Sequence, residues 1–236
     1  MLIDIHCHND EHQQIIQVQQ QHQMQSTISS TSNAEYEINR QAANAQQKLS
    51  YGVHPWQARQ ETVDAALLAR ASVIGEIGLD TTWTKVPLDI QRPVFQKQLE
   101  LAAVYHKPVV LHVKGCEREL LEQIQKFPVV HKLVHWYSAK HYLQQYLAVP
   151  NTWFSVGPDV FNDAAVQNVA QQVPLERLFI ESDGLEGISW AQNKPLDEID
   201  YWQTMQHLYA EVARLRKITT IELEQQIEQN WRQFFA

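Results

Sequence analysis

Short runs of β-branched and apolar residues alternate with helical stretches along the whole chain, and this alternation restricts the possible folds more than any other feature. In Gln91–His106 and Glu117–Phe127, for example, apolar residues recur at roughly helical spacing. Eight runs are candidate strands: Leu2–His6, Ser26–Ser30, Leu49–His54, Ser72–Glu76, Pro108–His112, Val129–His135, Thr152–Val156 and Arg177–Glu181. Eight strand–helix units predict an α/β fold, a (β/α)8 TIM barrel in which residues 1–236 form a single domain.

Two segments outside most of these strands have distinctive sequences. The glutamine-rich stretch Gln13–Gln25 predicts a solvated helix that leads into an irregular second strand, because biased polar tracts usually remain in water. The stretch Thr219–Phe235 opens with the Thr-x-x-Glu pattern of a capping box, formed by Thr219 and Glu222. Its aromatic end predicts a last helix that docks on the outer ring of the barrel.

The charge balance limits the kinds of partner that the chain can bind. A formal net charge of −8 excludes a large basic face that could hold duplex DNA along its length. A polyanionic substrate would have to be attracted locally, and bound divalent cations could provide that attraction. The two cysteines, Cys7 and Cys116, are too few for a disulfide framework and are expected to serve in packing.

The sequence also bears on location. The first residues, Met1–His6, place charge and imidazole where a secretory signal needs an uninterrupted apolar core. No later apolar run is long enough to span a bilayer. We therefore expect a cytoplasmic protein that does not bind to membranes.

Residues that can bind metal ions recur at the carboxyl ends of the predicted strands, the face on which barrel enzymes build their active sites. His6 and His8 alternate with Cys7, so both imidazoles point to one side of the first strand. Glu76 ends an apolar run, where a buried carboxylate needs a cation or hydrogen-bond donors. Three further strand ends repeat the pattern, with His112, His135 and Asp183.

These six side chains offer nitrogen and oxygen ligands. A single histidine at a strand end is usually a hydrogen-bonded structural residue, but repetition at several strand ends favours a shared site. Nitrogen and oxygen ligands without thiolate suit Zn²⁺, Mn²⁺, Mg²⁺ or Fe²⁺ and disfavour a sulfur-rich structural zinc site. Cys7 is therefore not expected to be a ligand.

Several motifs follow one another in an order that is specific in combination. They are Ile5-His6-Cys7-His8, Gly52-Val53-His54-Pro55, Ile74-Gly75-Glu76-Ile77-Gly78-Leu79-Asp80, Lys107-Pro108-Val109-Val110-Leu111-His112, Val134-His135, Glu181-Ser182-Asp183 and Asn193-Lys194-Pro195. With these motifs the chain resembles, over nearly its full length, the TatD family of metal-dependent deoxyribonucleases, which belongs to the amidohydrolase-like barrels.

The resemblance implies a centre with two divalent ions. The implied ligands are His6, His8 and Asp183 for one ion, His112 and His135 for the other, and Glu76 as the bridge between them. His54 matches a family position near the substrate phosphate. Lys114 stands where the family commonly has an arginine, and it could act as a point charge on a phosphate. The chain departs from the family at Asn9 and around Gly184, which affects the expected substrate more than the expected chemistry.

The implied activity is hydrolysis of phosphodiester bonds in DNA. Two ions, Zn²⁺, Mn²⁺ or Mg²⁺, would activate a water molecule, and Asp183 would accept its proton. Trp56, Trp83 and Trp136 lie on predicted strand-end loops and could stack unpaired bases, which would suit single strands or frayed ends.

Two other functions remain open at this stage. The same metal site could hydrolyse a small amide or ester, since a barrel fold does not decide the substrate. Alternatively, the barrel could be a non-enzymatic accessory subunit of a larger assembly, although buried charges of this kind would bring a scaffold no benefit. Near the site, Glu181 could support a ligand from behind, and Asp80 is expected to be a turn residue.

Overall fold

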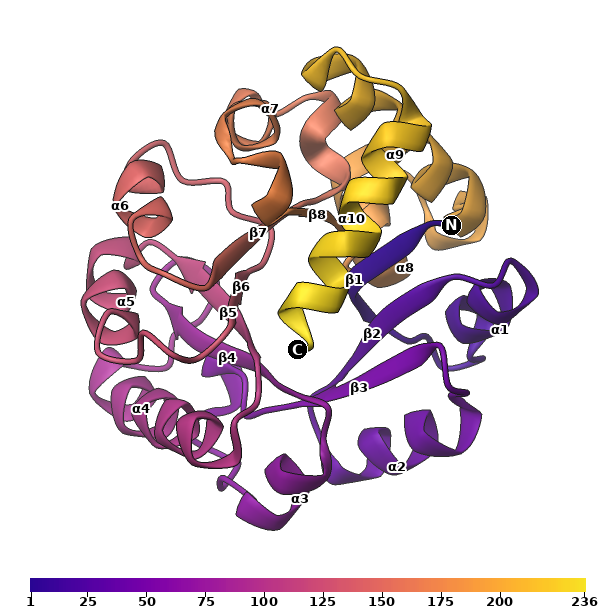
Figure 1. Cartoon of the computed structure of the whole chain (residues 1–236). Helices are drawn as coiled ribbons and strands as arrows, with labels where there is room; N and C mark the ends of the chain where they lie inside the picture. The colour runs from indigo at the N-terminus through magenta and orange to yellow at the C-terminus, as the bar shows by residue number, and fades with distance from the viewer.

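The computed structural model describes all residues, 1–236, and its centre is a sheet of eight parallel strands. Each strand pairs with the next one along the chain, in the order β1 to β8 (Figure 1). The strands are β1 (Ile3–His8), β2 (Gln25–Ser30), β3 (Gln47–Tyr51), β4 (Val73–Asp80), β5 (Val109–Lys114), β6 (Lys132–Val134), β7 (Thr152–Val156) and β8 (Leu178–Ile180). After β8, the Asp183 N–H donates to the carbonyl of His6 in β1. The predicted (β/α)8 barrel is confirmed.

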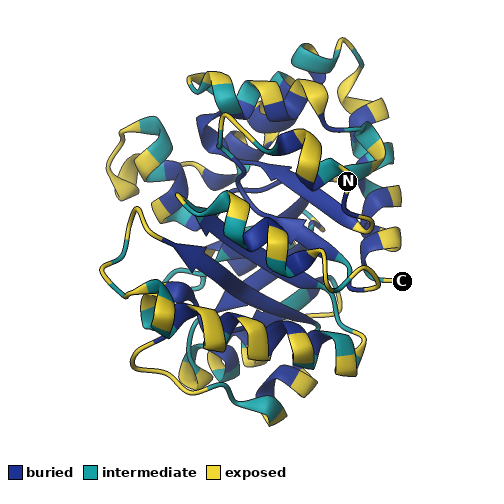
Figure 2. Ribbon diagram, turned by 90° about the vertical axis from the view of Figure 1, so that its left-hand side faces the viewer, coloured by how far each residue is buried: buried dark blue, intermediate teal, exposed yellow.

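Helices surround the strands as an outer ring (Figure 1). They are α1 (Gln14–Gln21), α2 (Asn33–Ala42), α3 (Ala65–Arg70), α4 (Leu88–Tyr105), α5 (Glu117–Ile124), α6 (Leu143–Leu147), α7 (Ala164–Gln172), α8 (Gly184–Gln192), α9 (Tyr201–Arg216) and α10 (Thr220–Phe234). Figure 2 shows buried strands and helices that are buried on one side and exposed on the other, as amphipathic helices on a barrel must be. The chain contains no helix with the length and apolar character needed to cross a membrane.

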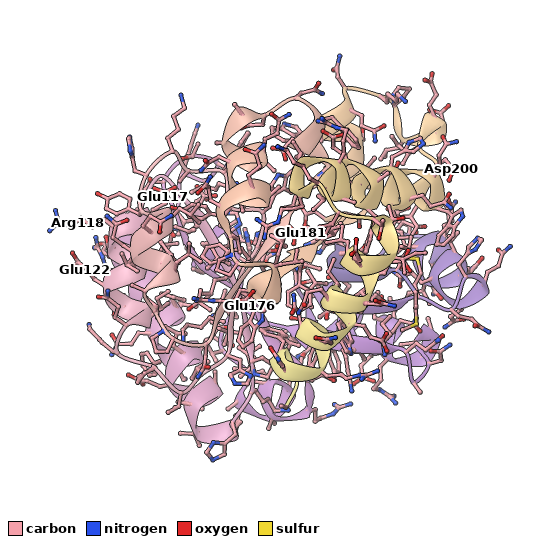
Figure 3. The ribbon with its side chains drawn as sticks, turned by 45° about the horizontal axis from the view of Figure 1, so that its top comes forward. Glu117, Arg118, Glu122, Glu176, Glu181 and Asp200 are labelled. Carbon is pink, nitrogen blue, oxygen red and sulfur yellow. The ribbon has the colours of Figure 1, made fainter.

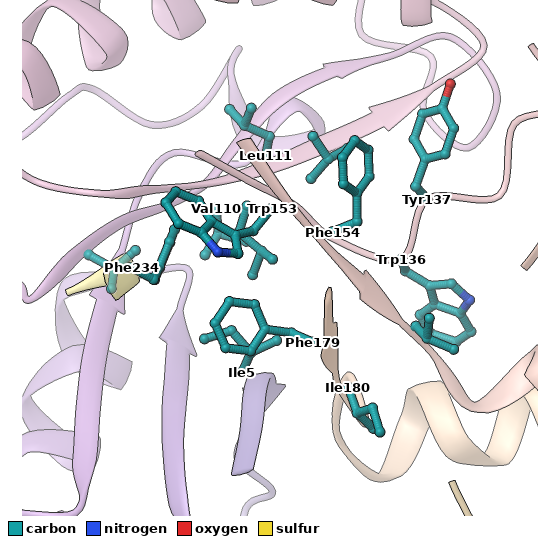
Figure 4. Packing of buried hydrophobic residues seen from close by; sticks show 14 of the residues in the cluster. Ile5, Val110, Leu111, Trp136, Tyr137, Trp153, Phe154, Phe179, Ile180 and Phe234 are labelled. Atoms are coloured by element: carbon teal, nitrogen blue, oxygen red, sulfur yellow. The ribbon is translucent and has the colours of Figure 1, made fainter. Parts of the chain in front are cut away.

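Helix α10 covers the amino ends of the strands. The predicted capping box is confirmed, because the Glu222 N–H donates to the Thr219 hydroxyl and the Glu222 carboxylate accepts from the Thr219 N–H. The expected docking on the outer ring was wrong. Phe234 instead packs among Trp153 and Phe179 at the end of the barrel (Figures 1 and 4), because this end would otherwise leave apolar rings in water.

The predicted strands are in place, but some of their bounds differ. β4 continues four residues beyond its predicted end at Glu76, because Ile77 and Leu79 are buried and pair with β5. β3 ends at Tyr51, before the predicted end at His54, and β6 is reduced to Lys132–Val134. The extension of β4 affects the site, because its last residue, Asp80, contacts the candidate ligand His112.

The region after β1 is more regular than its sequence suggests. β2 is a six-residue strand that pairs with both neighbours, and the expected irregularity is limited to a register shift in its pairing with β1, between Asp4 and Cys7. The helix in the glutamine-rich segment is present, but Gln19 is fully buried in it. Its side-chain amide donates to Tyr201 and its carbonyl accepts from Ser26, so these bonds replace the water that the composition predicts.

Candidate metal centre

The six predicted ligands meet at the carboxyl end of the barrel. His6 and His8 lie on β1, Glu76 on β4 and His112 on β5, whereas His135 follows β6 and Asp183 follows β8. Parallel strands direct their carboxyl ends to one face of a barrel, so residues more than 170 positions apart in the sequence come into contact there.

The two oxygens of Glu76 face two different groups of side chains. Oε1 lies 2.9 Å from His112 Nδ1 and 2.7 Å from His135 Nε2, and these two histidines with Oε1 are called the buried half. Oε2 lies 3.4 Å from His6 Nε2 and 3.3 Å from His8 Nε2. These histidines, Oε2 and Asp183, whose Oδ1 is 3.3 Å from His6 Nε2, are called the open half. One carboxylate thus touches both groups.

The halves differ in their exposure to solvent. The side chains of His112 and His135 are 8% and 5% exposed, whereas those of His8 and Asp183 are 31% and 24% exposed. His6 is fully buried between them. Water and small solutes therefore reach the centre through the open half.

The electrostatics of the centre favour positive charge around Glu76. Burial alone would raise the pKa of Glu76, but His135, His54 and His112 outweigh it and hold that pKa well below its usual range. Burial would lower the pKa of His6, but the carboxylates of Asp183 and Glu76 raise it well above its usual range. These carboxylates therefore favour the protonated form of His6, and a bound cation would supply the same positive charge.

The donor atoms are arranged better for binding a metal ion than for hydrogen bonding with one another. His6 Nε2 and Asp183 Oδ1 are buried and close together, yet neither makes a hydrogen bond of acceptable geometry. Unpartnered buried polar atoms are rare in proteins and call for a ligand. Three groups of donors lie close enough to hold an ion: His6, Glu76 and His135; His6, His8 and Asp183; and His54, Glu76 and His112.

A carboxylate lies behind each histidine of the buried half. Asp80 Oδ2 is 2.9 Å from His112 Nε2, and Glu181 Oε1 is 3.5 Å from His135 Nδ1. Figure 3 shows Glu181 near the middle of the molecule, far inside the exposed ion pair of Arg118 and Glu122. A carboxylate behind an imidazole fixes the ring and raises its basicity towards a metal.

Asp80 does more than the sequence indicated. The expected turn role is present, because its Oδ1 accepts from the N–H groups of Thr82 and Trp83. Its Oδ2 accepts from Trp56 Nε1 at 2.7 Å and contacts His112, a contact that the sequence reasoning missed. The signal was available, since Glu76 and Asp80 are four residues apart and point to the same side of an extended strand.

A second missed carboxylate supports the open half. Asp4 is fully buried and accepts from the N–H of Ser182 at 3.0 Å, from its hydroxyl at 2.6 Å and from Tyr201 Oη at 2.8 Å. Burial raises the pKa of Asp4 to about 6. These bonds fix the turn that carries Asp183, so Asp4 positions a candidate ligand without touching it.

The two residues expected to contact substrate lie beside the centre. His54 Nε2 is 3.4 Å from Glu76 Oε1, and burial lowers the pKa of His54. Lys114 Nζ donates to the carbonyl of Trp136 at 3.1 Å and to the hydroxyl of Ser138 at 3.0 Å. An ammonium group has three protons, so one of them remains for another acceptor.

The three expected stacking residues differ in exposure. Trp56 and Trp83 are 48% and 54% exposed, but Trp136 is only 7% exposed. Its indole N–H donates to Asp159, so the interpretation of Trp136 as a stacking residue was wrong. An exposed tryptophan in contact with it, Trp190 on α8, was missed because no strand-end pattern marks it.

The family model described as TatD related DNase matches residues 3–236. The chain belongs to this family. The family resemblance seen in the strand-end motifs is therefore confirmed.

Two proteins similar in sequence and one solved structure illustrate how far the similarity extends. The human 3'-5' RNA nuclease TATDN2 is 27% identical over 71% of this chain, which covers 24% of that protein. The uncharacterized metal-dependent hydrolase YabD of Bacillus subtilis is 30% identical over 47% of this chain, which covers 45% of that protein. These alignments thus span less than half of either relative. The crystal structure of YJJV, a TatD homologue from Escherichia coli, has a TM-score of 0.83 at 22% identity and matches 99% of this chain and 97% of its own, which shows a shared fold.

Proposed function

We propose that the barrel, residues 1–236, is one domain that hydrolyses phosphodiester bonds of DNA with two divalent ions. The observation that carries this proposal is the position of Glu76, whose two oxygens face two separate groups of nitrogen and oxygen donors. One ion would be held by His6, His8 and Asp183, the other by His112 and His135, whose nearest ring nitrogens are 3.3 Å apart, and Glu76 would join them. One relative is named an RNA nuclease and another a deoxyribonuclease, and together they support a nucleic-acid substrate.

The residues of the chain would have separate tasks. Bound divalent ions lower the pKa of a water molecule and neutralise phosphate oxygens, and Zn²⁺, Mn²⁺ or Mg²⁺ suits this chemistry. Asp183 lies in the open half, where water enters, and its carboxylate accepts the proton of the attacking water. His54 and the remaining proton of Lys114 contact the phosphate.

A single strand is the proposed form of the substrate, and a frayed duplex end could supply one. The chain has a net charge of −8, so it offers no extended basic face for a duplex. The exposed indoles of Trp56 and Trp83 lie beside the centre and suit unpaired bases. We keep the cytoplasmic location as a prediction, to be checked by fractionation of cells.

The decisive experiment measures nucleotide release from single-stranded DNA by the metal-loaded protein, with metal content determined in parallel. We expect release by the wild type and its loss with a chelator, with Glu76→Ala and with Asp183→Asn. No release from a fully metallated protein would reject DNA as the substrate. A panel of small amides and esters would then test the alternative hydrolase activity, and absence of metal binding would favour an accessory role.

A further inference from the structure

The exposed aromatic side chains of this protein are concentrated at the mouth of the barrel. The large apolar side chains that remain exposed include three aromatic ones, Trp56, Trp83 and Trp190. Trp56 and Trp83 follow β3 and β4, and Trp190 lies on α8, which begins directly after Asp183. Exposed indoles are unfavourable in water unless they serve a contact, so this clustering calls for a partner.

Trp83 and Trp190 meet across the mouth. Their ring centroids are 5.9 Å apart and their planes are nearly perpendicular, at 85°. β4 and β8 are four places apart in an eight-stranded barrel, so the loop after β4 and the helix after β8 start from opposite sides. The contact between these two rings therefore bridges the opening. An edge-to-face pair of this kind leaves one indole face uncovered.

A third indole, that of Trp136, contacts Trp190 of this pair. Trp136 lies 5.7 Å from Trp190, at 77°, and its N–H donates to Asp159 at 2.6 Å. Added side-chain carbons at Gly157 and Gly187 would lie only 2.5 Å and 3.2 Å from the Trp136 ring. At Gly157 the indole leaves no room for a side chain, whereas at Gly187 Asp183 Cβ, at 2.8 Å, is closer than the indole. Trp83, Trp190 and Trp136 together are called the tryptophan arch.

The arch is also tied to the metal centre. The N–H of Trp83 donates to Asp80 Oδ1, and Oδ2 of the same carboxylate lies 2.9 Å from His112 Nε2. On the other side, α8 starts at Gly184, next to Asp183. The backbone at Trp83 and the start of the helix that carries Trp190 are therefore both joined to the candidate ligands.

We infer that Trp83 and Trp190 form a stacking site for an unpaired base of a single-stranded nucleic acid whose backbone lies in the metal centre. This inference rests on the proposed function, because the phosphodiester at the centre places a base near the arch. Indole faces stack on any base. In a protein with a net charge of −8, such stacking supplies binding that a basic surface does not. Paired bases have no free face and are excluded.

The test compares two oligomers of equal length and charge, oligothymidylate and the same deoxyribose phosphate chain without bases. Their affinities for the metal-loaded protein are measured by fluorescence anisotropy of labelled phosphorothioate forms of both oligomers, which resist hydrolysis. We expect the wild type to prefer oligothymidylate by about tenfold. Trp83→Ala and Trp190→Ala should reduce this preference to about twofold or less, and Trp190→Phe should retain most of it.

Trp202→Ala is the matched control. Trp202 is partly exposed on α9, where it stacks on His22 with centroids 3.8 Å apart, outside the arch. This variant should keep the wild-type preference, and thermal unfolding should show that all variants are folded. Equal affinity of the wild type for both oligomers would overturn the inference, as would an unchanged preference in both arch variants.

Binding without hydrolysis separates this inference from the proposed function. If the metal-loaded protein cleaves neither oligomer but the arch variants lose the preference, the stacking site stands and the nuclease proposal fails. If oligothymidylate is cleaved equally well by wild type and arch variants and no preference is measured, the nuclease proposal stands and the stacking site fails.

Discussion

The buried half and the open half of the centre use the same ligand types in different surroundings. In the buried half, His112 and His135 are almost inaccessible and each has a carboxylate behind it. In the open half, His8 and Asp183 are partly exposed, and Asp183 is positioned through the turn at Ser182. We propose that this difference reflects a division of tasks, in which the buried half would hold and orient one ion and the open half would meet water and substrate.

Removing the residue common to both halves should have the largest effect. Glu76→Ala takes a ligand from each ion, so we expect metal content to fall from two ions to less than one. Phosphodiester hydrolysis should fall by at least about 10³-fold, since a metal centre supplies several kcal/mol to the reaction. Glu122→Ala, in an exposed ion pair on α5, is the control and should match the wild type. Two ions retained in Glu76→Ala would show that the halves do not share this carboxylate.

A change in the open half alone should lower the rate of hydrolysis while the ion of the buried half stays bound. Asp183→Asn removes the proposed proton acceptor, and kcat should fall by about 10²- to 10⁴-fold. The ion of the buried half should remain, so metal analysis should find about one ion per chain. His135→Ala should lose the other ion instead. An Asp183→Asn protein with wild-type kcat would contradict the assignment of the reactive side.

The supporting carboxylates allow a finer comparison. Asp80→Asn weakens the orientation of His112, and the affinity of the buried half for its ion should fall by about 10- to 100-fold. Asp4→Asn acts on Asp183 only through Ser182, so its effect on affinity in the open half should be smaller, about tenfold or less. Calorimetric titration of the metal-free variants measures both. An effect of Asp4→Asn larger than that of Asp80→Asn would reverse the proposed ranking.

The smallest expected effect is a dependence of stability on pH, measured in the metal-free protein. Burial acts to lower the pKa of His135, but Glu76 and Glu181 outweigh it and raise this pKa to about 9. A pKa raised above the value of about 6.5 in the unfolded chain adds stability that is present below about pH 6.5 and is lost as pH rises through about 9. The melting temperature with chelator should therefore fall across this interval, and less so in Glu181→Gln. A melting temperature that stays level or rises would contradict this assignment.

The sequence predicts the centre because two simple rules act together. Alternation along a strand places His6 and His8 on one side, and the parallel barrel brings the strand ends to one face. Neither rule depends on knowing the loops. The barrel and the convergence of all six candidate ligands therefore follow from local patterns.

The missing residues depend on contacts that local patterns do not encode. Asp80 was taken only as a turn residue because the predicted strand stopped at Glu76. Asp4 was missed because its partners Ser182 and Tyr201 are distant in the sequence. Trp190 lies inside a helix, and its role at the mouth depends on how that helix crosses the barrel. Such contacts arise from tertiary packing.

The most direct test of the account is anomalous X-ray diffraction from crystals of the protein loaded with Mn²⁺ or Zn²⁺. We expect two anomalous peaks, one on each side of the Glu76 carboxylate, the first between His112 and His135 and the second among His6, His8 and Asp183. A single peak, or peaks that do not contact Glu76, would contradict a centre of two halves joined by this residue.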